Sequence, residues 1–266
     1  MFSLKRIKAI QKGYWRTRQL LGLPARHDSE TLDRLRRLED LPEAHRPTSF
    51  DFPWGRFEFV HAGQLRSQFE EIFISRQYAF TPEGPDPIII DCGGNVGLSA
   101  IWFKLRYPTC KLTVYEVDPD LGDLLQGNLQ RAGFGSVEVC RKAVWIANAT
   151  VPFERTGDNS GRIVENGSCS FPAIDLSANL PDRVDLLKLD IEGAEYAVLD
   201  RLCETGAIER VRRLVCEFHV WRDSTDDLLR TLTHLRAGGM CFSMSAAAVP
   251  WIGQASEEAP FEVIKR

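Results

Sequence analysis

The sequence lacks the signals that would place the chain in several common protein classes. No two of its seven cysteines stand in C-x-x-C spacing, and their number is odd, which argues against a disulfide framework or a zinc site. No apolar run approaches the ~20 residues that span a bilayer, and no uninterrupted apolar stretch precedes a cleavage site near the N-terminus. We therefore expect reduced cysteines in a cytoplasmic protein without a signal peptide.

The chain also has little excess charge. Its net charge is -4 over 266 residues, which argues against a dedicated nucleic-acid partner. Basic side chains gather instead in residues 1–26, which carry seven of them and no acid. The apolar residues between them have helical spacing. This pattern fits a helix packed on its own domain or on a second subunit of a homo-oligomer; the alternative is a peripheral contact with an anionic membrane.

The order of expected elements divides the chain into three parts. We expect a basic helical N-terminal extension with a short exposed helix (1–50), a hairpin and helix cap (51–86) and a main domain (87–266). In the main domain, strands alternate with helices, which predicts an α/β fold with a parallel sheet. The expected strands lie at 88–91, 112–117, 137–145, 185–190 and 214–219, with a closing pair at 241–245 and 261–266. Residues 157–176 read as a long polar loop that could shape an acceptor site.

Two nucleotide-binding fingerprints are missing where the first strand of this domain ends. The stretch DCGGNVGLSA places Asp91, Gly93, Asn95 and Gly97 in a D-x-G-x-N-x-G motif. A G-x-G-x-x-G motif beginning at Gly93 would need glycines where Asn95 and Leu98 stand, and no Walker lysine follows. Glycines at a strand-to-helix turn still allow a ligand to lie against bare backbone and helix N–H groups.

An acid follows this turn at the tip of the next strand. Glu116 stands nineteen residues after Gly97, and a carboxylate in that place suits the two hydroxyls of a ribose. With this acid and the glycine turn, residues 87–266 resemble the class I S-adenosylmethionine-dependent methyltransferases. The resemblance implies a doubly wound, Rossmann-like, mostly parallel sheet of seven strands with an antiparallel C-terminal edge hairpin.

The same resemblance implies a set of contacts to S-adenosylmethionine. The acid of the first strand would lie near its methionine end, the glycine motif beneath it, the second acid at its ribose, and a short segment after the third strand by its adenine. The implied contact residues are Asp91, Gly93, Asn95, Gly97, Glu116, Lys142, Ala143 and Asp190, with Val144 beside the adenine.

Charged side chains end the fourth and fifth expected strands, LLKLDIEGAEY and LVCEFH. Because side chains alternate along a strand, Lys188 and Asp190 share a face, as do Glu217 and His219. We expect all four to meet at the carboxyl edge of the sheet, with His219 or Asp190 as general base, Glu217 orienting the imidazole, and Lys188 paired to Asp190 or Glu217. A buried ion pair that only fixes strand register is the structural alternative. Acids in the first turn of a helix also favour its dipole, so Glu195 fits either role.

The pairing of KLDIEGAE with LVCEFH, together with EIFISRQYAF upstream, resembles the FkbM-type methyltransferase family from about Phe59 to the end. This resemblance implies O-methylation of a hydroxyl on a sugar, glycolipid or polyketide-like acceptor. We prefer a metal-free mechanism; the alternative is a divalent ion held by Asp190, Glu217 and His219. Two other functions remain open, a nucleotide-dependent oxidoreductase and a non-catalytic module at a membrane.

Overall fold

The computed structural model describes residues 26–41, 48–156, 161–220 and 224–241. The chain divides into two compact units, Met1–Ala79 and Phe80–Arg266. The basic helix expected near the N-terminus lies outside the described residues, and of the closing pair of strands only Cys241 is described. The proposed subdivision at residues 50 and 86 stays a prediction.

The first unit combines two helical segments with a hairpin. Its elements are α2 (Arg26–Glu39), β1 (Ser49–Phe52), β2 (Gly55–Glu58), α3 (Ala62–Phe69) and a π-helical turn (Glu70–Ile74). The predicted hairpin is confirmed, with Phe52 paired to Gly55. The expectation that the first of these helices is exposed is wrong, because Leu32 and Leu35, three residues apart on α2, are buried.

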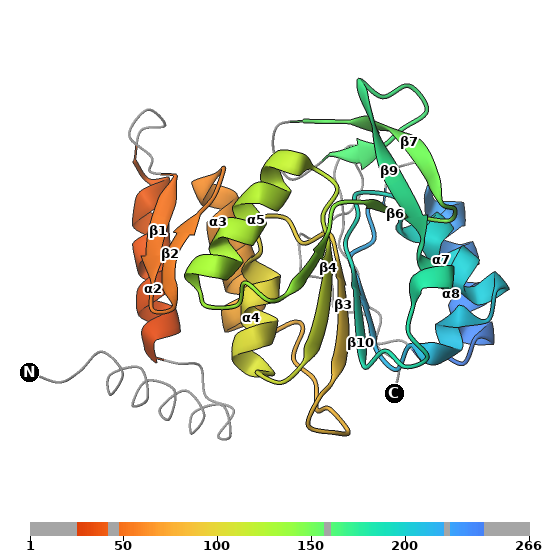
Figure 1. Cartoon of the computed structure of the whole chain (residues 1–266), viewed down its shortest axis with the longest axis horizontal. Helices are drawn as coiled ribbons and strands as arrows, with labels where there is room; N and C mark the ends of the chain where they lie inside the picture. The colour runs from red at the N-terminus through yellow and green to blue at the C-terminus, as the bar shows by residue number, and fades with distance from the viewer. Residues whose placement is uncertain (1–25, 42–47, 157–160, 221–223, 242–266) are drawn as a thin grey trace, which may run out of the picture. The chain divides into compact units, whose positions relative to one another are not determined.

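The second unit contains a five-stranded parallel sheet. Its strands are β3 (Ile88–Cys92), β4 (Lys111–Tyr115), β5 (Glu138–Cys140), β10 (Leu186–Leu189) and β11 (Leu214–Cys216), in the order β11-β10-β3-β4-β5. Helices α4 (Leu98–Arg106) and α5 (Pro119–Arg131) lie on one side of it, and α7 (Glu195–Glu204) and α8 (Thr225–Ala237) on the other (Figure 1). The predicted alternation of strands and helices is therefore confirmed over this part of the chain.

The strand order reverses between β3 and β10. The chain runs from β3 outward through β4 to β5, and then returns to build β10 and β11 on the other side of β3. Open α/β sheets bind ligands where the strand order reverses in this way, outside the carboxyl ends of the strands. The glycine motif follows β3 and Asp190 follows β10, so the topology brings both to the same edge of the sheet.

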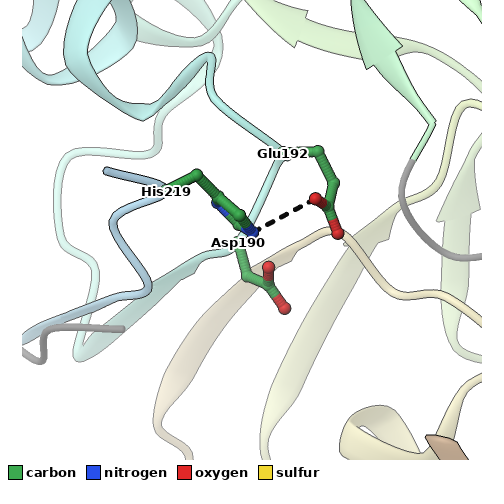
Figure 2. Close-up of side chains that lie close together, drawn as sticks. All are labelled: Asp190, Glu192 and His219. Atoms are coloured by element: carbon green, nitrogen blue, oxygen red, sulfur yellow. Dashed lines mark ion pairs between the residues drawn. The ribbon is translucent and has the colours of Figure 1, made fainter. Parts of the chain in front are cut away.

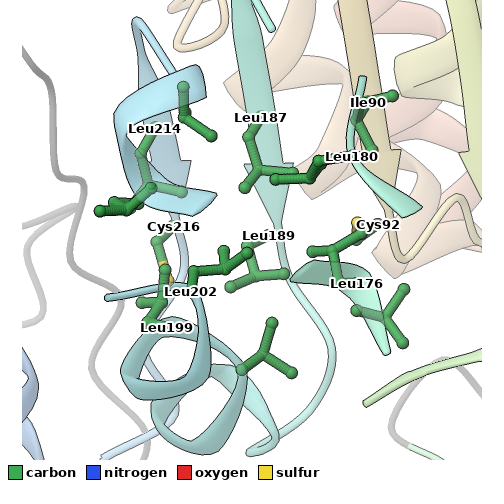
Figure 3. Packing of buried hydrophobic residues seen from close by; sticks show 14 of the residues in the cluster. Ile90, Cys92, Leu176, Leu180, Leu187, Leu189, Leu199, Leu202, Leu214 and Cys216 are labelled. Carbon is green, nitrogen blue, oxygen red and sulfur yellow. The ribbon is translucent and has the colours of Figure 1, made fainter. Parts of the chain in front are cut away.

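The central strands bury alternate side chains in one apolar cluster. Leu187 and Leu189 of β10 pack there with residues of the neighbouring strands and of α7 (Figure 3). Because side chains alternate along a strand, Lys188 points to the opposite face, where its register partner in β3 is Asp91. Both charged side chains are buried, so they must offset one another.

A second sheet differs from the prediction in two stretches, 137–145 and 157–176. The stretch 137–145 forms not one strand but two, β5 in the main sheet and β6 (Ala143–Trp145) in a sheet of order β6-β9-β7-β8. Its other strands are β7 (Ala149–Glu154), β8 (Arg162–Ile163) and β9 (Cys169–Asp175). Within the expected polar loop at 157–176, the structure thus has two strands, Arg162–Ile163 and Cys169–Asp175. Two strands of the second sheet, β7 and β9, contain Pro152 and Pro172. Proline normally interrupts a hydrogen-bond ladder, so the sequence pattern argued against strands here.

Two short helical segments complete the described elements, α6 (Leu176–Asn179) and a 3-10 turn (Ala207–Arg210). All seven cysteines are free thiols, as the sequence predicted. In the described part of the chain, no helix combines the length and apolar character that crossing a bilayer requires.

Candidate active site

The glycine motif forms a tight turn between β3 and α4. Gly93, Asn95 and Gly97 have φ angles of 85°, 47° and 93°, in the left-handed region that glycine adopts freely and asparagine tolerates. Gly93 also lies directly against the end of β10, because a Cβ there would overlap the carbonyl oxygen of Asp190. The turn can therefore keep this path only with glycine at position 93.

Lys188 supports the turn from below. Its Nζ donates a hydrogen bond to Gly93 O at 2.9 Å and lies 3.3 Å from carboxylate oxygens of both Asp91 and Asp190. Asp91 also accepts a hydrogen bond of 2.6 Å from Ser99 Oγ. Burial raises the pKa of Asp91, and Lys188 and Ser99 partly offset this effect. Asp91 has no exposed surface, and its contact with the methionine end of the cofactor stays a prediction.

Glu116 lies beside the turn, at the tip of β4. One carboxylate oxygen accepts a hydrogen bond from Asn95 N at 2.7 Å and the other from Asp118 N at 2.9 Å. A carboxylate has about four acceptor positions, so the hydroxyls of a ribose can still bind. Burial raises the pKa of Glu116 to about 7, although the two backbone hydrogen bonds oppose the shift.

Arg155, just after β7, fixes the loop that carries Glu116. Its guanidinium donates two hydrogen bonds, of 2.6 and 2.8 Å, to Asp118 at the N-cap of α5. Burial raises the pKa of Asp118, but these bonds and those from backbone N–H groups outweigh burial and hold it below its usual range. Lys142 is exposed and Ala143 is buried at the start of β6; their contact with adenine stays a prediction.

An acid–imidazole group forms where β10 and β11 end. We use this name for Asp190, Glu192 and His219, whose carboxylate oxygens and ring nitrogen lie within 4.8 Å of one another (Figure 2). His219 Nε2 lies 3.1 Å from Glu192 Oε2. The structure thus brings Asp190 and His219 together, as predicted, and adds Glu192.

Glu195 holds His219 from the opposite side. This fully buried residue begins α7, and its Oε1 lies 3.1 Å from His219 Nδ1. The same carboxylate accepts hydrogen bonds from Ile191 N at 2.8 Å and from Gly193 N at 2.9 Å. It therefore fixes both the imidazole and the loop that presents Glu192.

The carboxylates beside the two ring nitrogens of His219 do not come from the residue that we expected from the sequence. From the sequence we expected Glu217, which is half-buried just after β11, to orient the imidazole. Glu192 and Glu195 occupy both ring nitrogens instead. The acid spacing in DIEGAE was the available signal. Its meaning depends on the left-handed backbone at Glu192 and Gly193, with φ angles of 56° and 99°, which a sequence pattern does not show.

The two glutamates also decide the charge of His219. Burial lowers the pKa of the imidazole, but the hydrogen bonds that its N–H groups donate to Glu192 and Glu195 outweigh burial and raise the pKa to about 12. The raised pKa favours the protonated imidazole, and both ring nitrogens already lie 3.1 Å from glutamate oxygens, so His219 is poorly placed to accept a further proton. Of the two predicted bases, Asp190 has the more exposed side chain, at 29% against 5% for His219, and its role as base stays a prediction.

Solved methyltransferase structures share this fold. A methyltransferase FkbM from Methylobacillus flagellatus KT superposes with a TM-score of 0.51 at 18% identity, over 69% of this chain and 45% of that one. A SAM-dependent methyltransferase from Agrobacterium tumefaciens gives a TM-score of 0.51 at 11% identity, over 85% of this chain and 72% of that one. Our chain spans less than half of the first structure. These likenesses confirm the class I methyltransferase fold.

Sequence comparisons identify the family. "Methyltransferase 1" of Beauveria bassiana (strain ARSEF 2860) is 25% identical over 225 residues, covering 73% of this chain and 84% of that protein. "Methyltransferase sdnD" of Sordaria araneosa is 26% identical over 211 residues, covering 64% and 80%. The methyltransferase FkbM domain model matches residues 91–238, which include the glycine turn and the acid–imidazole group. Because this match spans more than half of the sequence, the chain belongs to the FkbM methyltransferase family.

Proposed function

We propose that this methyltransferase transfers the methyl group of S-adenosylmethionine to a hydroxyl oxygen of a sugar, glycolipid or polyketide-like acceptor. The observation that carries the proposal is that two features lie at the carboxyl edge of one sheet. The glycine turn and Glu116 follow β3 and β4, and the acid–imidazole group follows β10 and β11. The first suits a nucleoside, and the second can take up the proton of an alcohol.

The cofactor would lie against the glycine turn. The left-handed backbone at Gly93 and Gly97 shapes this turn, and α4 begins at Leu98, where the first N–H groups of a helix have no partner within the helix and can bind a ligand. Glu116 would accept hydrogen bonds from the ribose hydroxyls. Lys188 and Asp91 hold the turn in place from below.

Methyl transfer from a sulfonium requires few chemical groups. The acceptor oxygen forms a bond to the methyl carbon as the carbon–sulfur bond breaks, so placement along this line supplies much of the rate. The hydroxyl proton passes to the Asp190 carboxylate, S-adenosylhomocysteine leaves, and Asp190 returns the proton to solvent. The family assignment favours this transfer over the oxidoreductase and non-catalytic alternatives.

An acceptor screen tests the proposal. Purified protein is given S-adenosylmethionine with a labelled methyl group and panels of sugars, glycolipids and hydroxylated polyketide mimics. Each acceptor is paired with a matched compound whose hydroxyl is already methylated. We expect label in acceptors with a free hydroxyl and none in the matched compounds. Label only in amine or thiol acceptors would refute O-methylation.

The raised pKa of Glu116 predicts that cofactor binding depends on pH. Because the pKa is about 7, the carboxylate is ionised above this pH, where it accepts hydrogen bonds from both ribose hydroxyls. Below it the protonated acid loses part of this capacity. We expect the Kd for S-adenosylhomocysteine to rise up to about tenfold between pH 8 and pH 6. Calorimetry across this range measures it.

The matched variant for this prediction is Glu116→Gln. It should bind more weakly at pH 8, and its remaining pH dependence reports only the titration of the ligand itself. If the Kd of the unmodified protein follows the variant's pH profile, Glu116 is not the titrating group.

A further inference from the structure

We propose that the acid–imidazole group is a binding site for a divalent metal ion of the Mg²⁺/Mn²⁺ class. The ligand atoms are a carboxylate oxygen of Asp190, a carboxylate oxygen of Glu192 and Nε2 of His219 (Figure 2). From the sequence we considered a metal site with Glu217 as the third ligand. In the structure, Glu192 lies in that place beside Asp190 and His219. This inference deepens the proposed function by naming how the acceptor hydroxyl is activated.

The spacing of the three groups fits one ion. In an octahedral site with bonds of about 2.0–2.1 Å, neighbouring ligand atoms lie about 3 Å apart and opposite ones about 4 Å apart. Glu192 Oε2 and His219 Nε2 are separated by 3.1 Å, and no two ligand atoms of the group are more than 4.8 Å apart. Small side-chain rotations therefore bring all three within bonding distance of a central ion.

Glu195 gives the imidazole the orientation that a metal ligand needs. Metal-binding histidines usually donate their other ring N–H to a carboxylate or carbonyl, which fixes the tautomer. Here Nδ1 faces the fully buried Glu195 at 3.1 Å, and Nε2 is the nitrogen turned toward Asp190 and Glu192. Two backbone N–H groups hold Glu195 in place, so this arrangement exists before any ion arrives.

The donor set and the exposure of the site fit a catalytic ion. Carboxylate oxygens suit Mg²⁺ and Mn²⁺, and the imidazole adds a nitrogen that Mn²⁺ accepts. The ion would take the place of the Nε2 proton, as metal binding at histidine requires. Three protein ligands leave about three of six positions for water or acceptor oxygens. The side chains of Asp190 and Glu192 are 29% and 17% exposed, so an acceptor hydroxyl can reach the ion and lose its proton more readily.

Mn²⁺ alone, without methyl donor, is the probe that tests the site. Chelator-stripped full-length protein is titrated with Mn²⁺, and the free ion is followed by electron paramagnetic resonance. We expect one ion per chain, and a Kd at least about tenfold higher for Glu192→Gln and His219→Asn. Glu195→Gln should weaken binding about 10- to 100-fold through the orientation of His219 alone. The matched control is His234→Asn, which removes a histidine that lies 2.8 Å from Asp200 outside the site, and it should bind Mn²⁺ unchanged.

Two results would overturn this assignment. One is the absence of binding near one ion per chain in the unmodified protein. The other is binding that His219→Asn and Glu192→Gln retain, which would mark an adventitious ion elsewhere. Glu192→Gln keeps the test informative if the buried variants unfold, because its side chain is partly exposed. Neither negative result touches the proposed methyl transfer, which Asp190 can assist without a metal.

Discussion

Replacing Asp190 with asparagine is expected to lower the turnover number about 10²- to 10⁴-fold, the range for loss of a general base. The amide cannot take the hydroxyl proton, and it is a poorer ligand for a metal ion. The fold should survive, because Lys188 keeps its ion pair with Asp91 and its hydrogen bond to Gly93 O. Single-turnover methyl transfer measures the effect on each variant, with its fraction of folded protein determined by circular dichroism.

Asp185→Asn is the matched control for this change. Asp185 and Asp190 flank β10 at its opposite ends, and Asp185 is buried, with its carboxylate 2.8 Å from both Ile88 N and Arg183 Nη2. Its loss should reduce the free energy of unfolding by about 1–3 kcal/mol and leave turnover per folded molecule nearly unchanged. Equal losses of turnover in the two variants would show that Asp190 acts through structure and not through chemistry.

Gly93→Ala is expected to produce the largest loss of stability among single-methyl additions at the turn. The residue has a φ angle of 85°, and the added Cβ would overlap the backbone carbonyl of Asp190, which cannot rotate away as a side chain could. Left-handed strain and overpacking together should lower the free energy of unfolding by about 3–5 kcal/mol. Adenosyl-ligand binding should fall with it. Denaturant unfolding and calorimetry measure the two effects.

Gly133→Ala separates the strain from the clash. Gly133 has nearly the same φ angle, 82°, but nothing lies within 4 Å of a Cβ built there. This variant should lose only about 1–2 kcal/mol, the cost of a left-handed L-residue, and should bind the cofactor normally. If both variants lose the same stability, Gly93 does not make the close approach that the structure shows.

The parts of the fold that follow from local pattern were predictable. The apolar run IIID predicted β3, and the helical pattern after Gly97 predicted α4. The position of Glu116 indicated the end of β4. The second sheet was not predictable in this way. Pro152 and Pro172 lie within β7 and β9, and pairing with strands distant in sequence overrides the usual effect of proline on a ladder.

The site shows the same division between local and long-range information. The strand ends placed Asp190 and His219 correctly, because side-chain alternation and neighbouring strands decide where they meet. The partners of His219 depend instead on a left-handed turn at Glu192 and on a helix that begins with Glu195. The carboxylate spacing in the sequence is compatible with several such turns, so it did not show that Glu192 and Glu195 lie at the ring nitrogens.

Titration calorimetry with S-adenosylmethionine, S-adenosylhomocysteine and NAD tests the central claim most directly, since the proposed methyl transfer requires an adenosyl cofactor at the glycine turn. We predict binding of both adenosyl ligands and none of NAD, and weaker binding of both by Glu116→Gln. Binding of NAD alone, or of no ligand by folded protein, would contradict the account.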